Sequence, residues 1–189
     1  MNSKTVQLTL MDSLGSIRFS IPSQYDTSFL WTHTSDCGKS CDKIKYRFQP
    51  KLLPIFNESG FYWEELKDSI NQLTVYHSGE YPFRDFGDSI IFKYHSVAKD
   101  GILYDSLYKK IEIDTVKKIG DRYFSIMAYE EFNKRKAPFF KTIIAATTIK
   151  GNLIHFEYQL LTQTNDSVYK NFIQNSIVLL ETIRLGNGR

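Results

Sequence analysis

FFKTIIAATTIKGNLIHFEYQLL, residues 139–161, predicts a β-hairpin. Aromatic and β-branched residues fill Phe139–Lys150 and Leu153–Leu161, and Gly151-Asn152 separates the two runs. Glycine at the first position of a two-residue loop is typical of primed turns, whose twist matches that of the flanking strands. If Lys150 faces Leu153, two rows face each other on the buried side: Ile143, Ala145, Thr147 and Ile149 against Leu160, Tyr158, Phe156 and Ile154. The opposite side, which carries His155 and Glu157, is expected to be partly solvated.

The preceding residues predict another hairpin, formed by Ile111–Ile119 and Arg122–Phe132 around Gly120-Asp121. Counting outward from this turn gives one apolar face: Ile111, Ile113 and Ile119 with Phe124, Ile126 and Ala128. The connection between the two hairpins, residues 133–138, is polar and basic and ends in proline, so we expect a loop there.

Beyond residue 165 the apolar period changes from 2 to 3.6, which predicts a helix from about Asp166 to Arg184. Asp166 or Ser167 is available as its N-cap. The apolar stripe of this helix consists of Val168, Phe172, Ile173, Ile177, Leu180 and Ile183. The sequence therefore predicts an α+β fold, in which an antiparallel β-sheet built from hairpins carries the C-terminal helix on one face.

The N-terminal part of the chain is expected to add strands to this pattern. Lys4–Asp12 and Ser16–Pro22 alternate apolar and polar residues, which predicts a further hairpin. Ser23–Cys41 is interpreted as a polar stretch interrupted by three large apolar residues, Phe29, Leu30 and Trp31. The remaining expected elements are strands at 43–53, 68–77 and 90–94 and one or two helical turns near 102–108.

Length and charge limit the classes of protein. The chain has 189 residues, of which 42% are hydrophobic, and we expect a single domain spanning residues 1–189. The net charge of +3 is mild and its cations are not clustered, so no nucleic-acid partner is expected. No apolar run reaches the roughly 18–20 residues of a transmembrane segment. No signal peptide is visible, although Met1-Asn2-Ser3-Lys4 is also compatible with an expression start that replaces a removed leader.

The two ends of the pattern resemble a known family. Residues 17–22, IRFSIP, followed by Trp31, resemble the strand, proline and tryptophan with which PsbP-like proteins begin. The strand ending at Leu161 and the helix through Phe172–Ile177 resemble the way these proteins end. The resemblance implies an α/β/α sandwich around an antiparallel sheet. The family includes photosystem accessory proteins, Ran-binding proteins, bacterial lipoproteins and toxin-immunity proteins, so it implies binding to another protein without a shared catalytic motif.

Both cysteines lie in one short segment, Cys37-Gly38-Lys39-Ser40-Cys41. In an oxidising compartment we expect Cys37 and Cys41 to form a small disulfide loop, whereas in a reducing compartment they are two thiols. His33, Cys37 and Cys41 are spaced four residues apart, but zinc usually has a fourth ligand, so we expect no metal and no other cofactor. A cysteine nucleophile served by His33 would likewise need a third, orienting group.

Enzymatic motifs are absent from the sequence. His155 and Glu157 lie about 7 Å apart on one strand face, but nothing in the sequence supplies a nucleophile or an orienting group for them. His77 and His95 are isolated at the ends of predicted strands. Because no GxSxG, Walker, GxGxxG, HExxH or EF-hand pattern occurs, we expect the protein not to be an enzyme.

Two segments that mix aromatic rings with charges form the predicted partner-binding surface, because interface centres favour Tyr, Trp and Arg. They contribute Phe61, Tyr62, Trp63, Tyr81, Phe83, Arg84 and Phe86. Alternatively, the largest of these rings close the ends of the core.

Our hypothesis from the sequence is a non-enzymatic protein-binding domain, an accessory protein of lipoprotein type. Its expected location is extracytoplasmic, in the periplasm or cell envelope, and a cytoplasmic location stays open. The expected partner is another protein, a toxin or an envelope complex. Two alternatives remain: an immunity protein that neutralises a cognate bacterial toxin by direct binding, and a hydrolase with an unrecognised site.

Overall fold

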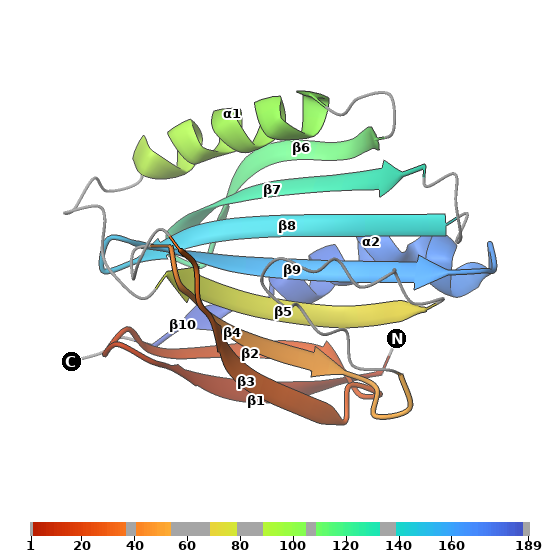
Figure 1. Cartoon of the computed structure of the whole chain (residues 1–189), viewed down its shortest axis with the longest axis horizontal. Helices are drawn as coiled ribbons and strands as arrows, with labels where there is room; N and C mark the ends of the chain where they lie inside the picture. Colours follow the sequence, from red (N-terminus) through yellow and green to blue (C-terminus); the bar gives the residue numbers. More distant parts are fainter. Residues whose placement is uncertain are drawn as a thin grey trace.

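The structure, a computed structural model, describes residues 2–36, 41–53, 69–78, 89–104, 109–132 and 139–186. Most of the strands form one antiparallel seven-stranded sheet in the order β3-β4-β5-β9-β8-β7-β6 (Figure 1). Its strands are β3 Thr27–His33, β4 Lys43–Gln49, β5 Ile70–Ser78, β6 Lys109–Ile119, β7 Arg122–Glu131, β8 Phe139–Ile149 and β9 Asn152–Thr162. The smaller sheet, in the order β1-β2-β10, consists of β1 Ser3–Leu10, β2 Gly15–Pro22 and β10 Arg184–Leu185. The described helices are α1 Ser89–Tyr104 and α2 Ser167–Leu180.

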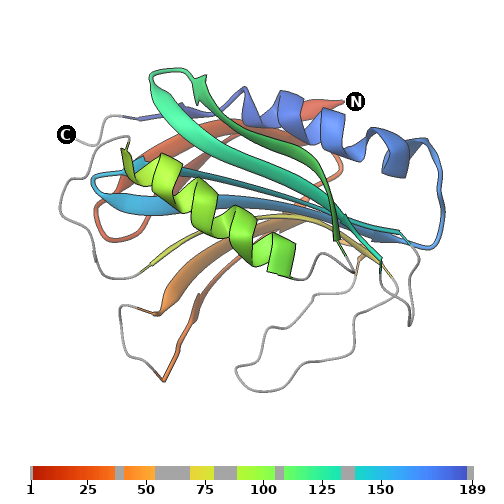
Figure 2. The same ribbon diagram turned by 90° about the horizontal axis from the view of Figure 1, so that it is seen from above.

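The predicted α+β fold with a mostly antiparallel sheet is confirmed, and three hairpins form where the alternation of residues predicts them: β1–β2, β6–β7 and β8–β9. Figure 2 shows α1 in front of the large sheet, with α2 and the β1–β2 hairpin behind it. The main core lies on this back side. There the ring of Phe19 on β2 makes edge contacts with Phe48 and Phe156 of the large sheet, at centroid distances of 5.7 and 6.0 Å.

The predicted register of the β8–β9 hairpin is wrong by two residues. Its loop is Lys150-Gly151, with φ of 49° and 79°, so that Ile149 pairs with Asn152. Two successive residues with positive φ define a type I′ turn, and glycine supplies the second position here. Because the shift is even, every side chain keeps the face predicted for it and only its partner changes. Ile143, for example, faces Tyr158.

The predicted face of β6 fails at Ile111. The register of β6 against β7 shifts between Ile111 and Ile113, which is a β-bulge, and Ile111 pairs with Tyr129. The extra residue turns the side chain of Ile111 to the front of the sheet, where it packs with Met127 and Tyr129. Ile113 stays on the back with the main core, as predicted.

The expected strand at 90–94 is wrong, because these residues belong to α1. The run of Ile and Phe there favours a strand, but the spacing of Ile91, Ala98 and Ile102 is helical and places them on one side of α1. Ile102 forms a cluster with Met127 and Tyr129 of β7, Ala98 packs against this cluster, and the helix contacts β6, β7 and β8. Packing of this face against the sheet therefore overrides the local propensity.

The other two errors concern strands at edges. Ser23–Cys41 contains β3, which the polar composition of that segment concealed. At the other end, the C-terminal helix stops at Leu180 with Glu181 as its C-cap, four residues before the predicted Arg184. The chain then forms β10 beside β2, and the Gly186 amide donates a hydrogen bond of 2.7 Å to the carbonyl oxygen of Ser16.

Asp166 is the N-cap of α2, and its carboxylate accepts hydrogen bonds from the amides of Val168 and Tyr169. Several apolar side chains of α2 are buried in the same cluster as Phe156: Tyr169, Phe172, Ile173, Leu179 and Leu180.

Candidate functional site

The predicted partner-binding residues all lie outside the described residues: Phe61, Tyr62, Trp63, Tyr81, Phe83, Arg84 and Phe86. Cys37 lies outside them as well, so its pairing with Cys41 stays a prediction. Among the described residues, no group of three or more His, Cys, Asp or Glu side chains is arranged to hold a metal ion. No described helix is both long and apolar enough to cross a membrane.

The front of the large sheet carries cations and aromatic rings where β3, β4 and β5 lie side by side. Residues in register share one face across neighbouring strands, so Trp31 lies beside Lys45, and Lys45 beside Tyr76. Lys43 and Arg47 flank Lys45 on the same face of β4. We name this set, Trp31, Lys43, Lys45, Arg47 and Tyr76, the cation–aromatic face.

Each ring of the cation–aromatic face lies within reach of two cations. Around Trp31, the Arg47 guanidinium carbon lies 4.8 Å and the Lys45 Nζ 6.0 Å from the ring centroid. Around Tyr76, the Nζ atoms of Lys43 and Lys45 lie 5.4 and 5.8 Å from the centroid. Cation–π contacts occur at these distances. Arg47 is buried and its Nε donates to Thr74 Oγ1 at 3.2 Å, whereas Lys43 is exposed and both rings are half-buried.

His155 extends this face toward α1. Its ring stacks on Tyr76 with a centroid distance of 4.5 Å and an angle of 3°. It makes a T-shaped contact with Tyr94 of α1, with centroids 5.3 Å apart. The Tyr94 hydroxyl lies 3.3 Å from His155 Nδ1. Burial, and secondarily the charge of Lys43, lower the pKa of His155 to about 3. The imidazole is therefore neutral near pH 7 and serves as a flat stacking surface rather than as a proton donor.

Glu157 has a separate hydrogen-bond chain. Gln159 Nε2 donates to Glu157 Oε1 at 3.1 Å, and Gln72 Nε2 donates to Gln159 Oε1 at 2.7 Å. The structure thus gives His155 aromatic partners and gives Glu157 amide partners. The predicted partial solvation of this face is confirmed, because the side chains of His155 and Glu157 are both half-buried.

A second constellation, beneath α1, contains a serine, a histidine and an aspartate. His95 Nδ1 lies 2.9 Å from Ser125 Oγ, and His95 Nε2 lies 2.6 Å from Asp114 Oδ1. Lys99 Nζ lies 2.5 Å from the other oxygen of Asp114, and Lys99, more than His95, holds the pKa of Asp114 below its ordinary value. In serine hydrolases Nε2 faces the serine and Nδ1 the aspartate, which is the reverse order. Ser125 is also only 1% exposed, so this group ties α1 to β6 and β7.

The predicted isolation of His77 and His95 is wrong for both residues. His77 is fully buried, stacks on Tyr46 and has its Nε2 atom 3.4 Å from the Tyr46 hydroxyl. The partners of His95 are hidden from sequence reasoning because the residues before it, 90–94, favour a strand by their composition. The alternation of Lys43, Lys45 and Arg47 with apolar residues did carry a signal for the cation–aromatic face, since every second residue of a strand shares a side.

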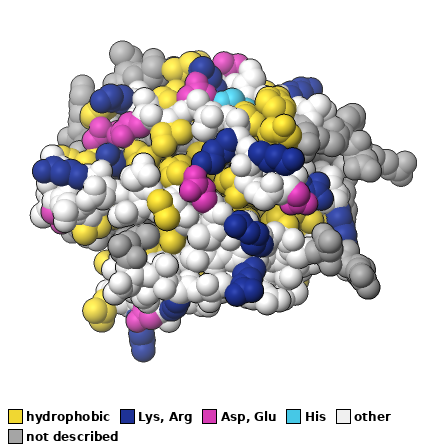
Figure 3. All heavy atoms as spheres, turned by 180° about the vertical axis from the view of Figure 1, so that it is seen from behind, with side chains coloured by type: hydrophobic (Ala, Val, Ile, Leu, Met, Phe, Trp, Pro, Cys, Tyr) yellow, Lys and Arg dark blue, Asp and Glu magenta, His cyan; other side chains and the backbone are white. Residues whose placement is uncertain are grey.

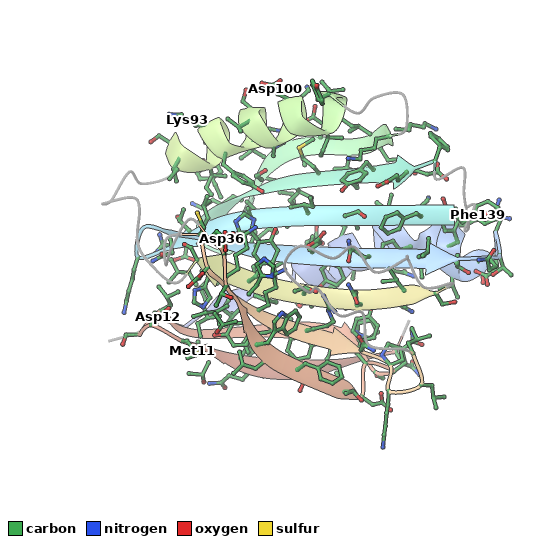
Figure 4. All side chains as sticks on the ribbon, in the orientation of Figure 1. Met11, Asp12, Asp36, Lys93, Asp100 and Phe139 are labelled. Atoms are coloured by element: carbon green, nitrogen blue, oxygen red, sulfur yellow. The ribbon has the colours of Figure 1, made fainter. Side chains whose placement is uncertain are left out.

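Figure 4 shows what lies around these groups. Lys93 and Asp100 point away from the sheet on the outer side of α1, and Asp36 lies in front of the sheet beyond the end of β3. On the back of the molecule, basic and acidic side chains are interspersed with apolar and uncharged ones (Figure 3). The back also has a cation–aromatic contact, since the Lys141 Nζ lies 4.6 Å from the centroid of the Tyr169 ring of α2. Only on the front do two described rings each lie near two cations.

Comparison with known proteins supplies a fold. The structure is similar to the solution structure of cyanobacterial PsbP (CyanoP) from Synechocystis sp. PCC 6803, with a TM-score of 0.50 and 11% sequence identity. The match covers 96% of this chain and 92% of that one. No family model and no curated protein sequence matches the chain. The chain thus has a PsbP-like fold, as the resemblance of its sequence implied.

Proposed function

We propose that this chain is a non-enzymatic protein-binding domain and that its partner docks on the cation–aromatic face. The observation that carries the proposal is that Trp31 and Tyr76, two half-buried rings on either side of Lys45, each lie within about 6 Å of two cations. Trp, Tyr and Arg are the side chains that most often dominate the energy of protein interfaces. The predicted aromatic segments, with Trp63 and Phe83, belong to the same proposal as an additional part of the surface.

The described chemistry favours binding over hydrolysis. Ser125 is buried beneath α1 and faces the wrong nitrogen of His95, and His155 is neutral between two rings. Neither group offers an accessible nucleophile with a base in reach of it.

The proposal includes a cellular setting and the role of α2. We propose that α2 forms the rear layer of an α/β/α sandwich, and that the protein works outside the cytoplasm as an accessory protein with Cys37 and Cys41 paired. Mass spectrometry of unreduced protein from its native compartment would then show two hydrogens fewer than the dithiol. Two freely alkylated thiols would contradict the extracytoplasmic assignment.

The experiment for binding is partner capture followed by a quantitative binding curve. Tagged wild-type protein captures its partner in native cells, and the purified partner is titrated against wild type and variants. Trp31→Ala removes a ring between two cations and should weaken binding about thirtyfold, which corresponds to about 2 kcal/mol. Phe92→Ala is the matched control, because Phe92 is an aromatic residue of α1 that is 51% exposed and lies off this face.

Three results would contradict the proposal. They are the absence of any saturable partner, equal losses in the two variants, and turnover of an ester, peptide or phosphoester by the purified wild type. If the captured partner is a toxin and this chain inhibits it, the protein is an immunity protein.

A further inference from the structure

The strand β3 forms one edge of the large sheet. It pairs with β4 without a register shift over seven residues, from Thr27 against Gln49 to His33 against Lys43. Within the described residues it has no second neighbour in the sheet. Figure 2 shows the β3–β4 hairpin projecting forward from the body of the molecule. An edge of this kind presents a row of backbone donors and acceptors to another strand.

The sequence of β3, TSFLWTH, lacks the features that block pairing at an edge. It contains no Lys, Arg, Asp, Glu, Pro or Gly. Natural proteins protect edges with charges, prolines, bulges or very short strands. One edge of the smaller sheet, β1, carries Lys4, and the opposite edge of the large sheet, β6, carries four lysines and a bulge.

The sequence of β3 is also suited to pairing with a second copy of β3. Leu30 is its central residue and is 57% exposed, while Phe29 and Trp31 beside it are half-buried on the other face. Antiparallel pairing of two copies about Leu30 would put Leu30 opposite Leu30 and Phe29 opposite Trp31. Aromatic pairs at directly opposed positions stabilise sheets, and β3 contributes no like charges to oppose each other.

We propose that two copies of this chain pair edge to edge along β3, antiparallel about Leu30, and join their large sheets into one. The cations of β4 do not prevent this arrangement. Neighbouring strands are about 4.8 Å apart, so the two β4 strands would be separated by about 14 Å. That distance exceeds the screening length of about 8 Å at physiological ionic strength. A charged partner strand, by contrast, would meet no opposite charge on β3 itself.

The test is the concentration dependence of the mass of the full chain by sedimentation velocity. Wild type should shift from 22.1 kDa toward twice that mass as its concentration rises. Leu30→Lys places two ammonium groups opposite each other at the two-fold axis and should raise the dissociation constant at least tenfold. Val178→Lys, at a 51% exposed apolar position of α2, is the matched control and should behave like wild type.

A second measurement uses the wild type alone. Hydrogen exchange of the amides of residues 28–32 should slow as concentration rises, while amides of β6 should not change. Wild type that stays monomeric throughout, a dimer unaffected by Leu30→Lys, or a dimer without protection of β3 would each overturn the proposal. Neither measurement needs a heterologous partner. The dimer proposal can therefore fail or succeed independently of the proposed binding at the cation–aromatic face.

Discussion

The two edges of the seven-stranded sheet differ in their charges and in their regularity. The edge at β6 carries Lys109, Lys110, Lys117 and Lys118, contains a bulge next to Ile111, and lies against α1. The edge at β3 is uncharged and regular. The large sheet therefore has one edge strand, β6, that is protected against pairing with another strand. Its other edge strand, β3, is suited to such pairing. The difference shows that edge protection is a property of each strand, read from its charges and its covering helix, and not of the sheet as a whole.

The largest expected effect contrasts one substitution under α1 with the same kind of substitution at the open edge. Met127→Asp would bury an unpaired charge beneath Ile102, since Met127 is 1% exposed, and should lower the free energy of unfolding by about 3–5 kcal/mol. Leu30→Asp should change it by no more than about 0.5 kcal/mol in the monomer. Urea unfolding of both variants, measured at low protein concentration, gives the comparison. Equal losses would mean that Leu30 is as deeply buried as Met127.

The next effect concerns His155 of β9, whose ring lies against Tyr94 of α1 and Tyr76 of β5. Its pKa is about 3 in the folded state and about 6.5 in the unfolded state, so the unfolded chain binds the additional proton between these values. The stability contributed by neutral His155 is complete above about pH 6.5 and is lost as the pH falls toward 3. Unfolding of wild type across this range should be steeper in pH than that of His155→Gln. An imidazole that titrates near pH 6.5 in NMR spectra would show that the ring is not enclosed.

A smaller effect is expected at the group that holds α1 over β6. The pKa of Asp114 is lowered mainly by Lys99, so its contribution to stability is present above the unfolded value of about 3.9 and is lost as the pH falls through the lower folded value. Asp114→Asn should remove this pH-dependent contribution to the free energy of unfolding and should speed hydrogen exchange in α1. Asp121→Asn, at an exposed turn of the same hairpin, is the control and should leave both measurements unchanged.

The smallest effect is expected from one lysine of the protected edge. Lys117 forms an ion pair with Glu181, and both side chains are more than a third exposed. Exposed ion pairs contribute roughly 0.2–1 kcal/mol, and Lys117→Ala should lower the free energy of unfolding by an amount within that range. Thermal unfolding measures it, with Lys118→Ala as the control. A loss well above this range would give the lysine a structural role beyond edge protection.

The hairpins could be predicted from the sequence because alternation and turn residues are local signals. The face of Ile143 was predicted correctly for this reason, whereas its partner was not, because the two-residue loop begins at Lys150. Lysine at positive φ is uncommon, and no sequence pattern marks it. Its Nζ donates to the carbonyl oxygen of Ser13 at 2.8 Å, a contact between segments far apart in sequence.

The helix α1, the strand β3 and the bulge at Ile111 could not be predicted, because tertiary contacts determine them. Tyr94 and His95 acquire their partners only when α1 lies on the sheet, and Trp31 acquires its cations only when β3 pairs with β4. The alternation of basic with apolar residues in β4 was visible in the sequence. The aromatic residues beside these cations lie on two other strands, β3 and β5, and could not be assigned to them. The contribution of the predicted segments around Trp63 and Phe83 stays a prediction.

The small sheet has a consequence for how the protein is made. Its middle strand, β2, is synthesised early, yet one side of that strand is completed by β10, and Ser16 bonds Gly186 near the other end of the chain. At about 5–20 residues per second, translation separates these partners by on the order of ten to thirty seconds. Phe19 can meet Phe48 early, but it acquires Phe156 only late in synthesis, and β2 acquires β10 later still. We therefore expect chaperones to bind nascent chains of this protein until β10 has left the ribosome.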